Sequence, residues 1–244
     1  MDLITLLLME CAVFAASLVG GLTGFGFALI LTPNLMLLLP PKTTIPIAVL
    51  LSMLLTIVLF YEVHSIAKPK EISQLIVSGI VGTILGSLLL VYIHVPLLKL
   101  LIGVIIVPFA LAQLLDFKIK IDSKVYQIPV GLLSGFLGGA TSMSGPPVVL
   151  FFQNMGYDKR VFRANLVSYF LLLYPFSLPT YWFSGLITAD VIYSTAITAP
   201  AMIIGTLLGS RLVHRVNERI FRTITLILVI VSGLFSIATS LSLF

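Results

Sequence analysis

The feature that most constrains this chain is an apolar run at 128–155 that is interrupted by the stretch GGATSMSGPP at 138–147. Glycines, small hydroxyl side chains and a Pro-Pro pair do not continue a regular helix, because proline lacks an amide donor and clashes with the preceding turn. Pro146 and Pro147 suit the first turn of a new helix, with Ser144 as its N-cap. The sequence therefore predicts two short helices that meet at a break in apolar surroundings.

A second interruption, GGLTGFGF at 20–27, lies between apolar arms at 3–19 and 28–39. Each arm has about 10 to 17 residues, fewer than the roughly 20 that a spanning helix needs. Irregular backbone at membrane depth is tolerated only where protein or a water-filled cavity surrounds it. Two such breaks at corresponding places in the two halves of a chain indicate a transport site.

Composition excludes a soluble domain, because 59% of the residues are hydrophobic, 9% are charged and the mean hydropathy is +1.18. The net charge of +5 comes from lysines and arginines beside apolar runs, so it indicates membrane topology rather than nucleic-acid binding. We expect a polytopic membrane protein.

Metal, redox and enzymatic chemistry are not expected. The one cysteine, Cys11, excludes an internal disulfide and a multi-thiolate metal site. His64, His94 and His214 lie near the ends of predicted spans and have no ligand spacing. No nucleophile–base pair or phosphate-binding loop occurs at a plausible depth, so we expect neither a cofactor nor an enzyme.

The chain divides into two halves. Apolar runs long enough to span follow each interruption, at 44–63, 72–93 and 97–115, and then at 161–183, 191–213 and 220–239. We predict a first membrane repeat at 1–115, a cytoplasmic connector at 116–127 and a second membrane repeat at 128–244.

An internal repeat supports this division. The motif GTxLGS occurs at 82–87 and again at 205–210, an offset of 123. Gly-Gly with a following threonine occurs at 20–23 and again at 138–141, an offset of 118. Small residues four apart allow helix backbones to approach closely, so we interpret GTxLGS as a packing motif.

The placement of lysine and arginine distinguishes parallel from inverted halves. If each interrupted segment crosses once, the halves are parallel and the loops divide the 14 basic residues 9 to 5. If each is a hairpin that returns to its own side, Lys42 and Lys99 lie on one face and the other twelve on the opposite face. The second division fits the positive-inside rule far better.

We therefore expect an all-α polytopic membrane fold of two inverted repeats, each a broken, re-entrant helical hairpin plus three spanning helices. Both termini would lie outside the cell membrane, and the cytoplasmic loops would be those at Lys68, Lys120, Lys159 and Arg215. The charge pattern leaves open whether the hairpin arms cross the bilayer fully.

The segments GGLTGFGFALILTP and GGATSMSGPPVVLFFQNMGYDKRVFRANLVSYF, together with the GTxLGS pair, resemble the sulfite exporter TauE/SafE family of membrane permeases. The resemblance covers essentially the whole chain, and the second-half segment is its most specific part. It implies a prokaryotic plasma-membrane transporter of sulfur-containing or small organic anions, such as sulfite or sulfoacetate. The first-half motif lacks the prolines of the second, so the two breaks are not chemically equivalent.

The expected site consists of the two breaks. A helix N-terminus presents free amides and a partial positive charge, which favour an anion, and inversion would bring both breaks together from opposite faces. The candidate substrate-binding residues at the breaks are Thr23, Gly24, Gly26, Thr141, Ser142, Ser144 and Gly145. The alternative is that these small residues only permit close packing.

Three further residues are candidates. Glu10 stands in an apolar arm, where a carboxylate is costly, so it is either a proton-coupling group or a residue exposed to water. Asn165 lies one helical turn from Tyr169 and is a candidate substrate-binding residue. Arg163 is interpreted as an inner-face anchor in preference to a ligand.

The sequence thus predicts a secondary transporter that exports a small sulfur-containing or organic anion by alternating access, with a passive anion channel as the alternative. The expected partners are the anion, protons and the lipid bilayer, and no nucleic acid is expected.

Overall fold

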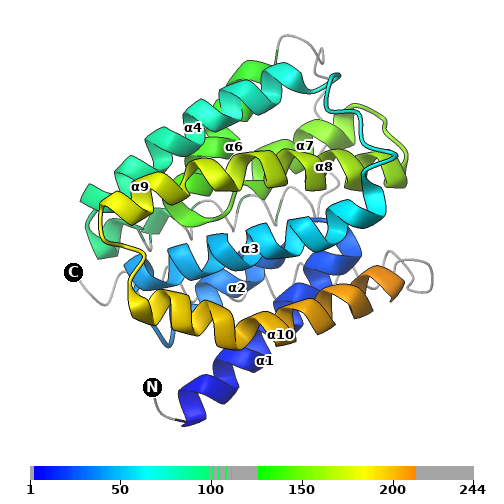
Figure 1. Ribbon diagram of the computed structural model, residues 1–244. Helices are drawn as coiled ribbons and strands as arrows, with labels where there is room; N and C mark the ends of the chain where they lie inside the picture. The colour runs from blue at the N-terminus through cyan, green and yellow to red at the C-terminus, as the bar shows by residue number, and fades with distance from the viewer. Residues whose placement is uncertain are drawn as a thin grey trace.

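The computed structural model describes residues 3–98, 126–212 and single positions between 100 and 111, and the described part contains helices and no strands (Figure 1). The helices of the first half are α1 (Leu3–Thr23), α2 (Phe27–Leu35), α3 (Pro41–Val63) and α4 (Ser73–Tyr92). Those of the second half are α6 (Gln127–Thr141), α7 (Gly145–Asn154), α8 (Lys159–Leu173), the 3-10 turn η1 (Tyr174–Phe176), α9 (Leu178–Phe183) and α10 (Ala189–Leu212). The predicted connector and the span at 220–239 lie outside the described residues, as does most of the span at 97–115.

Among the described residues, five helical segments are long and apolar enough to cross a membrane: α1, α3, α4, Lys159–Phe183 and α10. On α4 and α10 many large apolar side chains are exposed and most of the small residues are buried, the reverse of a soluble bundle. The expectation of an all-helical, multi-pass membrane protein is confirmed.

Both interruptions are breaks between two helices. In the first, Gly24 and Gly26 adopt φ of 78° and 89°, and in the second Ser142 adopts φ of 66°. These positive values end α1 and α6, and α2 and α7 then turn back along them (Figure 1). Backbone of this kind favours glycine, because the left-handed region brings a β-carbon too close to the following carbonyl.

The first arm is longer than predicted. The pair Gly20-Gly21 was expected to interrupt the helix, but α1 continues through both glycines and has 21 residues, long enough to span. The glycines are retained for packing: a β-carbon on Gly20 would lie 2.8 Å from that of Phe27, and one on Gly21 would overlap the backbone of Thr206.

Ser144 was predicted to cap α7 with its side chain, and that prediction is wrong. Ser144 occupies the N-cap position of α7, but its side chain makes no capping hydrogen bond. An N-cap hydroxyl accepts from the second or third amide of the helix. Here those positions are Pro146 and Pro147, which have no amide hydrogen, so the hydroxyl is left for another use.

Two helix pairs approach so closely that their backbones touch, as predicted for GTxLGS. A β-carbon on Gly86 of α4 would overlap the carbonyl oxygen of Phe136 on α6, and one on Gly209 of α10 would overlap that of Leu18 on α1. Gly209 follows Gly86 by the repeat offset of 123, and Phe136 follows Leu18 by the offset of 118. The two contacts therefore correspond residue by residue.

The same correspondence holds one turn away. A β-carbon on Gly139 would overlap the carbonyl oxygen of Thr83, and one on the equivalent Gly21 would overlap that of the equivalent Thr206. In each pair a helix of one half packs against a helix of the other half. We call α4–α6 and α1–α10 the crossed helix pairs.

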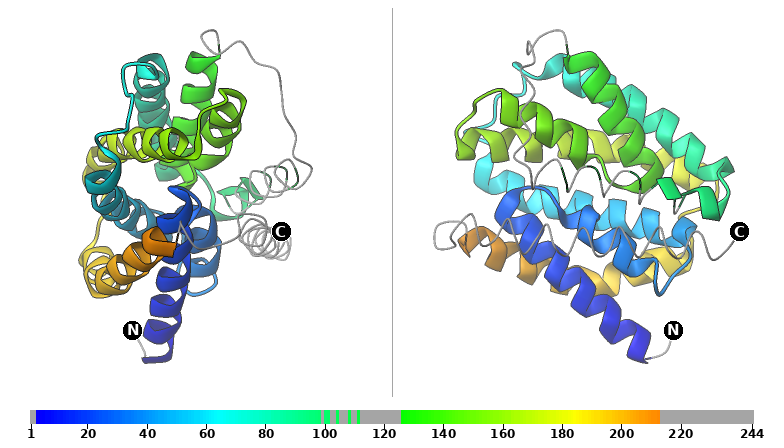
Figure 2. Two further views of the ribbon diagram at one scale, coloured as in Figure 1. Left: turned by 90° about the vertical axis from the view of Figure 1, so that its right-hand side faces the viewer. Right: turned by 180° about the vertical axis from the view of Figure 1, so that it is seen from behind.

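The crossed pairs lie on opposite sides of the bundle, with α3 and α8 between them (Figures 1 and 2). Within each pair residue numbers rise together along the contact, so the paired helices run in the same direction. Between pairs the direction is opposite: α1 and α10 run from left to right in Figure 1, and α4 runs from right to left.

Candidate functional site

A cavity of about 20 Å³ lies where the two breaks meet, which is room for about one water molecule. Its walls are residues 24–29 of the first break, Ser142, Met143 and Gly145 of the second, Ser52, Leu55 and Thr56 of α3, and Phe170 and Tyr174 beyond them. Four predicted site residues, Gly24, Gly26, Ser142 and Gly145, thus line one cavity. We call it the break cavity.

The two breaks are in direct contact beside this cavity. The hydroxyls of Thr32 on α2 and Ser142 share a hydrogen bond of 2.6 Å, and both side chains are fully buried. A β-carbon on Gly145 would be 3.9 Å from the side chains of Leu29 and Phe25. The N-terminal ends of α2 and α7 therefore border the same small space.

Thr23 and Thr141 are used to shape the breaks. The hydroxyl of each donates to the carbonyl four residues before it, at 2.8 and 2.6 Å. Each also accepts from the amide two residues after it, at 3.2 and 3.3 Å. Because a hydroxyl has one hydrogen to donate, neither threonine has a donor left for an anion in this arrangement.

Unlike the hydroxyls of Thr23 and Thr141, those of Ser144 and Ser52 are not used in local hydrogen bonds. Both side chains are buried, with 1% and 2% exposure, and neither hydroxyl has a hydrogen-bond partner among the described residues. Both lie near the hydroxyl of Tyr174, but neither makes a hydrogen bond of normal geometry with it. A buried hydroxyl without a partner costs about 1–3 kcal/mol, so this group of hydroxyls is suited to hold a ligand or a water.

Ser52, Thr56 and Tyr174 were not predicted from the sequence. One signal was available: Ser52 and Thr56 are polar, one helical turn apart, and stand in an otherwise apolar span. Two such residues lie on one face of a helix, which marks the side that turns away from lipid.

Asn165 and Glu10 are not brought to the break cavity. The Asn165 side chain is fully buried, and its Oδ1 accepts from the backbone amide of Lys68 at 2.8 Å, in the loop after α3. Glu10 is half-buried on α1, between exposed leucines and Cys11. It lies 14 residues before Gly24, about 20 Å along a helix.

Comparison with known protein families matches residues 10–236 to the sulfite exporter TauE/SafE family, which is nearly the whole chain. The chain belongs to the TauE/SafE family. The resemblance found in the sequence is thereby confirmed, and the family consists of membrane transporters rather than enzymes. No curated protein and no solved structure matches the chain.

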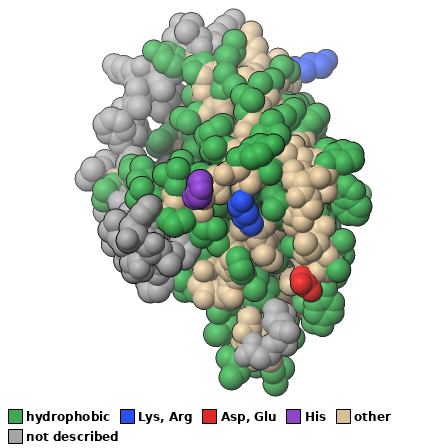
Figure 3. Space-filling view, turned by 90° about the vertical axis from the view of Figure 1, so that its left-hand side faces the viewer, with side chains coloured by type: hydrophobic (Ala, Val, Ile, Leu, Met, Phe, Trp, Pro, Cys, Tyr) green, Lys and Arg blue, Asp and Glu red, His purple; other side chains and the backbone are tan. Residues whose placement is uncertain are grey.

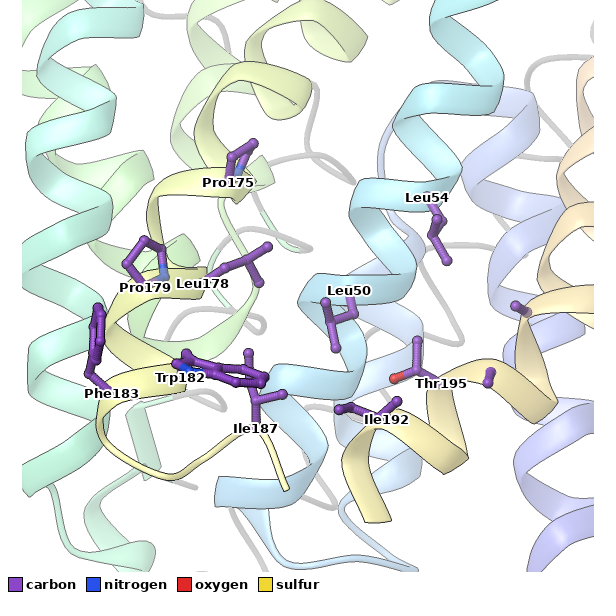
Figure 4. A pocket seen from close by; sticks show the side chains of 12 residues that line it. Leu50, Leu54, Pro175, Leu178, Pro179, Trp182, Phe183, Ile187, Ile192 and Thr195 are labelled. Carbon is purple, nitrogen blue, oxygen red and sulfur yellow. The ribbon is translucent and has the colours of Figure 1, made fainter. Parts of the chain in front are cut away.

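This TauE/SafE chain has a much larger hollow, of about 770 Å³, between α3, α9 and α10 (Figure 4). Its walls are almost entirely apolar, and several of them, such as Leu54, Trp182 and Phe183, are exposed. The hydroxyl of Thr195 donates to a carbonyl of its own helix at 2.8 Å. Apart from the indole N–H of Trp182, the described side chains of this groove offer an anion no free donor, so the smaller break cavity is the better candidate site.

The TauE/SafE chain also has an ion pair behind the first break, between the buried Arg163 and the exposed Glu62. In the described part of the chain, no three His, Cys, Asp or Glu side chains come close enough to hold a metal ion.

Proposed function

We propose that this protein is a secondary transporter that exports a small sulfur-containing or organic anion, of the sulfite or sulfoacetate class, and binds it in the break cavity. The observation that carries the proposal is the pair of unpartnered hydroxyls, Ser52 and Ser144, beside a cavity bordered by two helix N-termini. Membership of the TauE/SafE family supports the class of substrate.

The two breaks would offer different donors to the anion. The first turn of α2 keeps the amides of Phe27, Ala28 and Leu29, whereas α7 begins Gly-Pro-Pro and contributes hydroxyls instead. Among the described residues that line the cavity, none is lysine or arginine.

The anion would bind weakly in the break cavity, and a transporter needs weak binding in order to release its substrate. Two helix ends at about 0.3–2 kcal/mol each and a few hydrogen bonds at about 1 kcal/mol each correspond to a Kd from millimolar to high micromolar.

The size and surroundings of the cavity support alternating access as the mechanism. A multi-atom anion needs more room than one water molecule, so the two breaks must move apart to admit it. The crossed helix pairs run in opposite directions, which is what two inverted repeats would produce. Rocking of one repeat against the other would then open the cavity first to one side and then to the other.

Orientation in the membrane follows from charge. The end of the molecule that faces left in Figure 1 shows few charged side chains on its described part (Figure 3). Lys68, Lys70, Lys159 and Arg160 lie in loops or helix starts at the opposite end. We assign the opposite end to the cytoplasm.

Two single cysteines test this orientation. Ser65 and Ser184 are both exposed, in the α3–α4 and α9–α10 connections. In a Cys11→Ala background, Ser184→Cys should react with an impermeant maleimide in whole cells, and Ser65→Cys should react only after permeabilisation. Labelling of Ser65→Cys from outside would reverse the orientation.

Sulfite flux in proteoliposomes tests the function. A transporter should show counterflow, so that unlabelled sulfite inside the vesicles accelerates the entry of labelled sulfite. A passive channel shows no such acceleration. Absence of flux with sulfite, sulfoacetate and simple carboxylates would contradict the proposal.

A further inference from the structure

Arg163 of α8 is buried, with 8% exposure, and holds the carboxylate of Glu62 with both terminal nitrogens. Nη1 donates to Oε1 at 2.9 Å and Nη2 donates to Oε2 at 3.2 Å. This two-point arrangement is the geometry in which a guanidinium recognises a planar oxyanion most strongly.

The pair, between α8 and α3, also contacts two other helices, α1 and α10. Nη2 of Arg163 also donates to the carbonyl of Gly21 on α1 at 2.8 Å and to the hydroxyl of Ser210 on α10 at 3.1 Å. The Ser210 hydroxyl in turn donates to the Glu62 carboxylate on α3. Nε of Arg163 is buried and has no hydrogen-bond partner among the described residues, so the guanidinium retains a donor.

One residue separates Arg163 from the break cavity. Gly24 lines that cavity, and a β-carbon on Gly24 would lie 2.8 Å from Cγ of Arg163. An anion that enters the cavity past the first break from the cytoplasmic end therefore passes the Arg163 side chain.

The equivalent position in the other half shows that a charge is not needed for structure. Gly139 corresponds to Gly21, and its carbonyl accepts a hydrogen bond of 2.5 Å from the neutral hydroxyl of Tyr181. An ion pair with one exposed partner, as Glu62 is here, often adds little to stability. A hydrogen bond to the Gly21 carbonyl therefore does not by itself explain why the side chain that donates it is an arginine, Arg163.

We propose that Arg163 is a second anion site, next to the break cavity, which the Glu62 carboxylate occupies in this structure and which the transported anion takes over on its way from the cytoplasmic end to the break cavity. This inference rests on the proposed function. The ligand class is a small oxyanion with at least two oxygens on one centre, such as sulfite, a sulfonate or a carboxylate. Glu62 acts as a resident carboxylate that the anion displaces.

Thermal unfolding of purified protein tests the site without relying on transport. Glu62→Gln removes the resident carboxylate and leaves Arg163 to the added anion. With sodium sulfite at about ten times its Kd, the apparent Tm of this variant should rise by about 3–6 °C beyond the rise in the parent. Sodium chloride at equal ionic strength should not produce the extra rise.

The extra rise must depend on Arg163. It should disappear in Glu62→Gln/Arg163→Gln, and it should persist in Glu62→Gln/Arg160→Gln, which removes an exposed arginine from the same helix. No extra rise in Glu62→Gln, or a rise that survives loss of Arg163, would overturn the proposal.

A second variant keeps the proposal testable if Glu62→Gln does not fold. Arg163→Lys retains the charge but cannot hold two oxygens at once, so the KM for sulfite flux should rise about tenfold, and an unchanged KM would overturn the proposal.

Gly145→Val distinguishes this site from the break cavity. Alone, it should abolish the sulfite-induced rise in Tm that the parent shows. Combined with Glu62→Gln, it should leave the extra rise of Glu62→Gln in place. If Gly145→Val changes nothing while the Arg163 dependence holds, the break cavity fails and the Arg163 site stands.

Discussion

The two breaks lie at equivalent positions and are built from different residues. Gly24 and Ser142 occupy equivalent positions and both have positive φ, 78° and 66°. Glycine adopts that conformation without strain, whereas a serine is disfavoured by about 1–2 kcal/mol. The second break offsets this through the hydroxyl of Ser142, which bonds to Thr32 of the first hairpin.

Two positions later the difference is larger. Gly26 has φ of 89°, whereas its equivalent, Ser144, has an ordinary helical backbone and a hydroxyl without a partner among the described residues. The first break therefore provides backbone shape and amides, and the second provides hydroxyls. The two copies of the repeat thus keep the position of the break while their backbone conformation and side-chain chemistry differ.

The largest effect is expected at Gly24. Gly24→Val combines a β-branched residue at positive φ with a β-carbon 2.8 Å from Arg163, so the first break should not form. We expect little monodisperse protein in size-exclusion chromatography. Normal yield and a normal elution profile would mean that the two breaks do not depend on glycine for their shape.

Gly145→Val should separate folding from binding. Gly145 does not have positive φ, and its β-carbon would have its nearest described neighbours at 3.9 Å, so the variant should be monodisperse. The added side chain would enter the break cavity, and the affinity for sulfite should fall by at least about tenfold, or about 1.4 kcal/mol, in a thermal-shift titration. Aggregation of this variant would instead support a break that only packs.

Substitutions of Ser142 measure what its hydroxyl contributes to the second break. Ser142→Ala keeps the strained φ and loses the bond to Thr32, so the free energy of unfolding should fall by about 1–2 kcal/mol. Ser142→Gly loses the same bond but removes the strain, so its change should be clearly smaller. Equal losses in the two variants, measured by denaturant or thermal unfolding, would show that the backbone at Ser142 is not strained.

The smallest effect is expected for Ser144→Ala. Because the Ser144 hydroxyl lacks a partner in the described structure, its removal should leave stability without ligand unchanged or slightly higher. Sulfite affinity should fall about three- to tenfold if the hydroxyl donates to the anion. A variant that binds sulfite as well as the parent would remove Ser144 from the site.

The sequence was sufficient for the features that depend on local chemistry. Glycine and proline affect the backbone conformation within a few residues. The two breaks and the helix start at Pro146 and Pro147 could therefore be predicted from the sequence alone. The GTxLGS packing could be predicted because the motif recurs at a constant offset. The exact end of α1 could not, because Gly20 and Gly21 are equally compatible with a break and with close helix contact.

The remaining parts of the site depend on which elements meet in space. Nothing local to Ser52 or Tyr174 indicates that they approach the second break. Arg163 was interpreted as an anchor, since a lysine or arginine at the start of a span is usually one, and its partner Glu62 lies 101 residues earlier. Asn165 was placed in the cavity by its spacing from Tyr169, but the loop after α3 engages it instead.

The crossed helix pairs have a consequence for how the protein is made. Gly205 follows its contact Ser17 by 188 residues. At about 5–20 residues per second, roughly 10–40 s of synthesis separate α1 from the helix it packs against. During that interval the small-residue face of α1 has only lipid or the insertion machinery beside it. Neither half can complete its packing before the other has been translated, so we expect that the two halves expressed as separate chains assemble only when both are present in the same membrane.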